Sequence, residues 1–155
     1  MMPLMMDSPQ EPPQQPSPEP SPSPTLHPKQ LAIPLPLTPH TTLHLQITSL
    51  NTSNLIFLTS TDPSSSGSLS ALGSFVYAMP NRLQPSDPLC TALCSQNGSI
   101  EFANRLAKIL ARRTEKPTYV GSSVVFGNPT VEEEMAGVRA VVDEVLKIVH
   151  GEQKG

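Results

Sequence analysis

The sequence predicts an α+β domain in which a mostly antiparallel sheet of five or six strands carries two main helices on one face. Short apolar runs with strand-like patterning recur between Thr42 and Phe126. Two longer stretches instead place apolar residues three or four positions apart, as amphipathic helices do. The composition changes sharply near residue 40, so we expect the domain to span residues 41–151, after a tail over residues 1–40.

The expected tail is defined by proline. Of the 19 prolines, 13 lie between Pro3 and Pro39. The run PQEPPQQPSPEPSPSPTLHP has almost no side chains that could bury apolar area, so residues 1–40 are predicted to be disordered. The more apolar LAIPLPLTP, Leu31–Pro39, is expected to dock loosely on the domain, because its prolines keep it out of any central strand.

Four strands are expected before the first helix. The first, Thr42–Ser49, alternates so that Leu43, Leu45 and Ile47 share one buried face. A polar NTSN turn then leads to a run that is apolar on both faces. The remaining three strands are Leu55–Leu58, Leu72–Met79 and Leu89–Ser95.

The second half of the domain is predicted to be helix, strand, helix. A helix begins near Ser99, and Pro117 prevents its continuation. A strand follows over Tyr119–Phe126. The last helix has a capping box at its start, with Thr130 as the cap and a glutamate three residues later, and Gly151 is expected to end it.

Charge and cysteine content indicate the compartment. The net charge of −3 gives no general attraction to nucleic acid or to an anionic membrane. Cys90 and Cys94 lie about 13 Å apart if they share a strand, too far for a disulfide, so we expect free thiols in a reducing compartment. No apolar run approaches the roughly 18 residues of a membrane span. The N-terminus resembles neither a signal nor a transit peptide, so a cytoplasmic and nuclear location is expected.

Signals for enzyme chemistry are weak, and no cofactor or metal is predicted. No His, Cys or carboxylate pair has metal-ligand spacing. Glu132–Glu134 fit the positive start of a helix better than a cation site. One enzymatic alternative is a small hydrolase that uses Cys90 or Cys94 as nucleophile and His44 as base.

One charged cluster is a candidate for partner binding. Arg105, Lys108, Arg112 and Arg113 fall off the apolar stripe of the first helix, and Lys116 follows in the turn. The cluster is either an ordinary solvated helix face or a docking patch for an acidic protein surface. Nucleic acid is a poorer fit, because aromatics form only 4% of the chain and none interleave these cations.

A count of sheet faces predicts a second partner surface. Two helices cover one face of a sheet, yet several of the strands are apolar or small on both faces. An exposed apolar face of several hundred Å² marks a partner surface, so the other sheet face is expected to form a dimer. The residues expected on that face are Cys90, Ala92, Cys94, Val120, Val124 and Phe126.

The run LAKILARRTEKPTYVGSSV, Leu106–Val124, resembles the proteasome assembly chaperone 4 family in its fungal-type form. Members carry a helix that ends in a Leu-Ala-Arg-Arg/Lys-Thr-like run, then a lysine, then a strand of the Tyr/Phe-Val-Ser type. The matching positions here are Leu110, Ala111, Arg112, Arg113, Thr114, Lys116, Tyr119 and Val120. The order of elements matches from Leu43 to Val149, but not over the tail or the TDPSSSGS loop.

The resemblance implies a non-enzymatic chaperone of 20S proteasome assembly. Such a chaperone forms a heterodimer with a proteasome assembly chaperone 3-like protein, and the pair binds proteasome α-type subunits and promotes α-ring formation. The α-subunit contact is assigned to Arg105, Lys108, Arg112, Arg113 and Lys116 from charge and position alone. The alternative is a longin- or profilin-like adaptor module whose Pro-rich tail binds SH3 or WW domains.

Overall fold

The fold is described from a computed structural model, which covers residues 3, 13, 26–63 and 71–154. Most of the predicted Pro-rich tail therefore lies outside the described residues. The same holds for the serine- and glycine-rich part of the loop that was predicted after Thr61.

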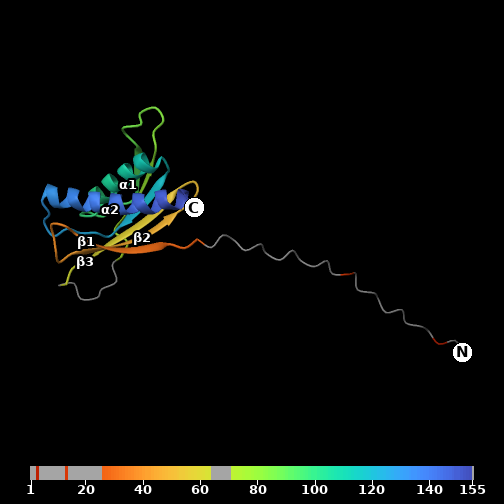
Figure 1. Ribbon diagram of the computed structural model, residues 1–155, viewed down its shortest axis with the longest axis horizontal. Coiled ribbons are helices and arrows are strands. Elements are labelled where there is room, and N and C mark those ends of the chain that lie inside the picture. The colour runs from red at the N-terminus through yellow and green to blue at the C-terminus, as the bar shows by residue number, and fades with distance from the viewer. Residues whose placement is uncertain (1–2, 4–12, 14–25, 64–70, 155) are drawn as a thin grey trace.

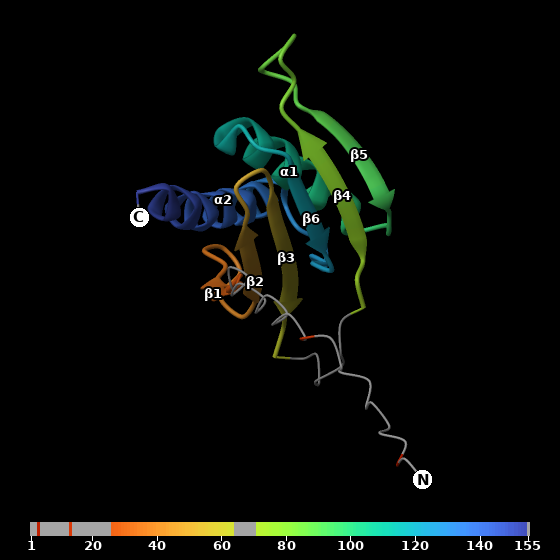
Figure 2. The ribbon, with the colours of Figure 1, turned by 90° about the vertical axis from the view of Figure 1, so that its right-hand side faces the viewer.

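The sheet has six strands in the order β1-β2-β3-β6-β4-β5, with two helices packed against it (Figures 1 and 2). The strands are β1 Lys29–Pro34, β2 Thr42–Ser49, β3 Asn54–Thr61, β4 Ser74–Met79, β5 Leu89–Cys94 and β6 Thr118–Ser122. The helices are α1 Ile100–Thr114 and α2 Val131–Gln153. The predicted α+β class, with a mostly antiparallel sheet and two main helices, is confirmed.

Strand β6 is the last strand in the sequence but lies in the centre of the sheet. The chain leaves β3, forms the β4–β5 hairpin and α1, and then returns to place β6 between β3 and β4. β6 runs parallel to β3 and antiparallel to β4, and the other neighbouring strands of the described sheet are antiparallel. Val120 of β6 lies opposite Ile56 on one side and Val76 on the other, and all three are fully buried.

The core lies between the sheet and the helices, which both lie on the same side of it (Figure 2). From α1, Ala103, Leu106 and Leu110 are fully buried, as the three- and four-residue spacing predicts. The buried stripe of α2 consists of Val138, Val141, Val142, Val145 and Val149. From the sheet, Leu43, Leu45 and Ile47 of β2 complete the layer, which confirms the predicted buried face of that strand.

The sheet begins before the expected boundary at residue 41. β1 pairs with β2 in antiparallel register, and its Leu31 and Ile33 pack against the core. A proline is tolerated here because β1 is an edge strand, where a missing N–H donor costs no bond on the outer side. The expectation that residues 1–40 form a single tail is therefore corrected: the domain includes β1, and the surrounding prolines concealed its alternation.

Two element ends differ from expectation. β6 stops at Ser122 rather than at Phe126, and Val124 and Phe126 turn down toward the helices, where Phe126 packs edge-on against Phe102 with ring centroids 5.3 Å apart. α2 continues through Gly151 to Gln153. An exposed ion pair of 3.0 Å between Lys29 and Glu152 connects this last turn to β1.

The start of each helix is fixed by a different side-chain arrangement. Ser99 lies at the N-cap of α1 but makes no capping bond, and its hydroxyl instead bonds to the Ser74 hydroxyl at 2.7 Å, which joins the helix to β4. At α2 the predicted capping box is present. The Glu133 N–H donates to Thr130 Oγ1 at 3.2 Å, and the Thr130 N–H donates to a Glu133 carboxylate oxygen at 2.9 Å.

Replacing Thr130 with alanine removes the acceptor for one N–H of the first turn of α2. We expect Thr130→Ala to lower the free energy of unfolding by about 1 kcal/mol, measured by urea denaturation. The control is Thr52→Ala in the exposed β2–β3 turn, which is expected to leave stability unchanged. Equal losses for both variants would contradict the capping role.

Candidate protein-interaction surfaces

The sheet face opposite the helices carries a row of aromatic rings, and we call this surface the open face. Phe57 of β3, Tyr119 of β6, and Phe75 and Tyr77 of β4 alternate with the buried core residues of their strands. Centroid distances are 6.2 Å from Phe57 to Phe75, 6.0 Å from Phe75 to Tyr119, and 4.7 Å from Tyr77 to Tyr119. All four rings are half-buried by one another, so the row forms one apolar surface.

Gly121 allows the row to form. It lies on β6 directly opposite Phe57 of β3 and Phe75 of β4. A Cβ at this position would lie 2.5 Å from Cδ1 of the Phe57 ring, so any larger residue would displace the ring. The glycine therefore gives the Phe57 ring the space to lie across the sheet and stack on Phe75.

Exposed aliphatic side chains extend the open face toward β5. Met79 of β4 is 39% exposed and lies opposite Leu89 of β5, which is 54% exposed. Toward β1 the surface is hollowed by a cavity of about 680 Å³, whose lining includes Phe57 and Leu72 with the polar His44 and Gln46. The open face therefore has a raised aromatic centre and a recess toward the β1 edge.

The structure corrects the residues that were expected on this face. Val120 and Val124 are fully buried beneath the helices, and Phe126 packs on Phe102 of α1. Cys90 and Ala92 lie opposite the core residues Ala78 and Val76 of β4, so they belong to the helix side. Only Cys94 reaches the open face, opposite Phe75, because an irregularity between Phe75 and Val76 shifts the register there.

The signal for the true open face was present in the sequence. Four of the six aromatic residues occupy it, and each is flanked along its strand by residues that are fully buried. The strand positions were found, but the choice between the two alternating sets was wrong for β5 and β6. Neither set is polar in these strands, so alternation alone cannot assign the face.

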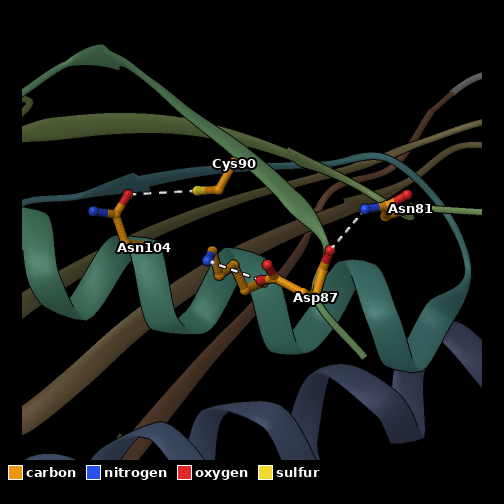
Figure 3. Close-up of polar contacts among 5 residues, drawn as sticks. Asn81, Asp87, Cys90 and Asn104 are labelled. Atoms are coloured by element: carbon orange, nitrogen blue, oxygen red, sulfur yellow. Dashed lines mark hydrogen bonds and ion pairs between the residues drawn. The ribbon is translucent and has the colours of Figure 1, made fainter. Parts of the chain in front are cut away.

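The nucleophile and base of the hydrolase alternative do not meet. His44 projects from β2 on the open-face side, where its Nε2 bonds to Thr61 Oγ1 at 2.9 Å. Cys90 is on β5, and three strands of the sheet separate the two. Figure 3 shows the Cys90 thiol directed at Asn104 of α1, with a sulfur–oxygen distance of 3.5 Å. Burial raises the pKa of the Cys90 thiol, while the charge of Lys108 opposes that rise, so the thiol form is favoured.

Three of the five predicted basic residues come together on α1. Arg105, Lys108 and Arg112 line a cavity of about 350 Å³ between the helix, the end of the β4–β5 connection and Met135 of α2. Arg113 and Lys116 are not part of its lining. Lys116 instead donates to the Leu50 carbonyl at 3.3 Å, so it holds the β2–β3 turn against the turn between α1 and β6.

The charges on this helix are only partly neutralised. Arg105 pairs with Glu134 of α2 at 3.1 Å, and Lys108 pairs with Asp87 at 3.4 Å. Among the described residues, Arg112 and Arg113 have no ion pair, and both are exposed. The two arginines at the last turn of α1 are therefore the cations of this helix most available to an external acidic group.

Within residues 26–63 and 71–154, no three His, Cys, Asp or Glu side chains gather closely enough to hold a metal ion. Neither helix is both long and apolar enough to cross a membrane.

The chain is thus an open six-stranded α+β sheet with both helices on one face and a row of aromatic rings on the other. Comparison with protein families matches residues 42–124, more than half of the chain, to the family described as proteasome assembly chaperone 4. The chain therefore belongs to the proteasome assembly chaperone 4 family, which confirms the resemblance found in the sequence. No curated protein matches in a sequence comparison.

A solved structure shares the fold. It is a chain from the structure described as "Crystal Structure of a Novel Chaperone Complex for Yeast 20S Proteasome Assembly". The alignment has a TM-score of 0.56 and 18% sequence identity, and it covers 82% of this chain and 97% of the yeast chain. At that identity the similarity establishes a common fold.

The two thiols should react at different rates. Cys94 is exposed, whereas Cys90 is half-buried and its pKa is raised by burial. We expect iodoacetamide at mildly alkaline pH to alkylate Cys94 first, because the Cys94 thiol is the more accessible one and burial disfavours the reactive thiolate form of Cys90. Peptide mass mapping over time measures both rates, and the urea-unfolded chain is the control. Faster labelling of Cys90 in the folded chain would contradict the arrangement.

Proposed function

We propose that this protein is a non-enzymatic chaperone of 20S proteasome assembly that forms a heterodimer with a proteasome assembly chaperone 3-like protein. The pair binds proteasome α-type subunits and promotes formation of the α ring. Family membership supports the assembly role, and the aromatic open face is the observation that carries the heterodimer.

The open face has the chemistry of a protein interface. An apolar sheet face is stabilised when it packs against another apolar surface. Both helices pack on the opposite face of the sheet, so within the described residues no helix covers the open face. Tyrosine and phenylalanine are enriched at protein interfaces, and tyrosine is among the residues that contribute most binding energy, because it buries a large area at low entropic cost. The Tyr77 and Tyr119 hydroxyls give such a surface polar groups as well. A second sheet of the same fold supplies a matching partner face, and the recess near His44 would receive a bulky side chain from it.

The α-subunit contact is assigned to the basic side of α1, away from the open face. Arg112 and Arg113 lead this surface because they are exposed and have no ion pair in the described structure. Arg105 and Lys108 extend it along the helix. Lys116 contributes by fixing the turn through its bond to Leu50, so its effect on binding would be indirect.

The chaperone acts through binding energy alone. One surface joins the two chaperones into a rigid unit, and a second surface presents cations to an acidic region of an α-type subunit. Occupying that region holds the subunit ready for its proper neighbours during ring formation. Release then requires that later assembly steps compete for the same surface. The expected setting is the cytoplasm and the nucleus, which fractionation of cell extract would test.

An acidic substitution in the aromatic row should break the heterodimer. Tyr77→Asp places a charge at the centre of the buried interface, and we expect a loss of about 2 kcal/mol or more, roughly thirtyfold in Kd. The control is Leu37→Asp, which changes an exposed leucine outside the sheet. Affinity purification followed by mass spectrometry measures the partner recovered with each variant. Equal recovery with Tyr77→Asp and wild type would contradict the proposed interface.

Charge reversal on the last turn of α1 should weaken α-subunit binding without affecting the binding of the chaperone partner. We expect Arg112→Glu/Arg113→Glu to retain the chaperone partner and to weaken α-subunit binding by about tenfold or more. The matched control is Arg139→Glu/Lys147→Glu on the exposed side of α2. Surface plasmon resonance with purified α-type subunits compares the two. Unchanged binding by the α1 variant would show that the contact lies elsewhere.

A further inference from the structure

The strand β5 ends the described sheet with an unusually unprotected edge. Its sequence LCTALC contains no charged residue and no proline, and its Leu89 and Leu93 are 54% and 57% exposed. The opposite edge strand, β1, begins with Lys29 and ends with Pro34, two residue types that discourage strand addition. An edge without such protection offers its free N–H and C=O groups to another chain.

Strand β5 pairs with β4 along one side and contacts α1 on the helix side of the sheet. Figure 3 shows the Cys90 thiol near the Asn104 side chain, at 3.5 Å. Lys108 pairs with Asp87 just before the strand at 3.4 Å. Asn81 closes the projecting β4–β5 connection by donating to the Asp87 carbonyl at 3.3 Å. Its side-chain oxygen also accepts from the backbone N–H groups of Leu83 and Gln84. A strand that is already paired with β4, after a connection closed by Asn81, needs little ordering to accept a neighbour, which favours binding.

A cavity lies beside β5 on the helix side of the sheet. Its volume is about 410 Å³, and its lining consists of Cys90, Ala92, Glu101, Asn104, Arg105 and Lys108. The lining carries two cations and one carboxylate, so it favours an acidic group. The ion pairs that Arg105 and Lys108 already make are partly solvent-exposed, and exposed pairs are weak. An incoming carboxylate can therefore compete for both cations.

Side chains of an added strand would alternate between two environments. Every second side chain would lie on the helix side, over Arg105 and Lys108, and the others would continue the open face next to Leu89. We propose that the β5 edge binds an extended segment of a partner protein that carries acidic residues at alternate positions, with apolar residues between them. Arg105 and Lys108 of this site also belong to the proposed α-subunit contact. The choice of a partner protein as the occupant rests on the proposed function, whereas the unprotected edge and the cavity beside it do not.

The direct test is peptide binding by the full chain, measured by fluorescence anisotropy. The probe is a labelled heptapeptide of alternating valine and glutamate, and the comparison peptide has lysine in place of glutamate. The glutamate peptide should bind more tightly, and Lys108→Glu should weaken it by about tenfold or more while improving binding of the lysine peptide. The matched control is Lys147→Glu, since Lys147 also pairs with a nearby carboxylate but lies on α2. If Lys108→Glu and Lys147→Glu behave alike, the proposal is overturned.

Backbone pairing is tested separately from charge. Successive N–H groups of a strand point to opposite sides, so two versions of the glutamate peptide, N-methylated on alternate sets of residues, block opposite edges. Strand addition predicts that one N-methylated peptide binds and the other does not. If both peptides bind, or if neither binds, strand addition is overturned.

Two other outcomes would also overturn the proposal. Affinity for inorganic polyphosphate equal to that for the glutamate peptide would show that the site recognises negative charge alone. If the edge takes a second copy of this chain, the free protein would sediment as a dimer that the peptide dissociates, which would also overturn the proposal.

These tests are independent of the proteasome role. Peptide binding can succeed while purified α-type subunits fail to bind, or the reverse. A failure of the edge proposal is therefore distinguishable from a failure of the proposed function.

Discussion

The packing of α1 across β6 and β4 is the contact on which the molecule depends. Ala103, Ala107 and Ala111 let the helix approach the sheet closely, while Leu106 and Leu110 fill the space between them. The buried Asn54 side chain donates to Thr114 Oγ1 at 3.1 Å, which fixes the end of the helix at the start of β3. The same helix delivers the chain to β6, so its position sets the register of the central strands.

That contact also determines which side of the sheet remains open. With α1 and α2 on one side, every second residue of β3, β6 and β4 faces away from the helices. Four of those positions hold aromatic rings, which a solvated face would not be expected to carry side by side, and Gly121 is small enough to let the rings stack. A monomer gains little from such a surface, whereas a heterodimer would bury it. The assembly role of the family and the one-sided architecture are therefore consistent with each other.

Much of this fold was predictable from the sequence, because the helices and β2 have a single apolar face and strong boundary signals. The α1 stripe, the Thr130 capping box and the alternation of β2 all appear in the structure as expected. The face of β5 and β6 was not predictable by alternation, because the buried set of β6 includes the polar Thr118 and Ser122, and Ala92 of β5 lies between polar Thr91 and apolar Leu93. The apolar run at residues 124–126 was predicted to extend β6, but Val124 and Phe126 owe their apolar character to packing in the core beneath the helices. β1 was not predicted because the prolines around it disfavour a central strand, although an edge strand tolerates proline.

The most direct test of the central claim is hydroxyl-radical footprinting of the aromatic row. In the free chain, Phe75, Tyr77 and Tyr119 are half-exposed and should be oxidised, whereas fully buried side chains such as Leu106 should not. In the heterodimer isolated from cells, the account predicts strong protection of these three rings, with Leu83, which is 98% exposed at the β4–β5 tip, as an internal reference. Equal oxidation of the rings in the free and assembled protein would contradict the claim that the open face is the partner interface.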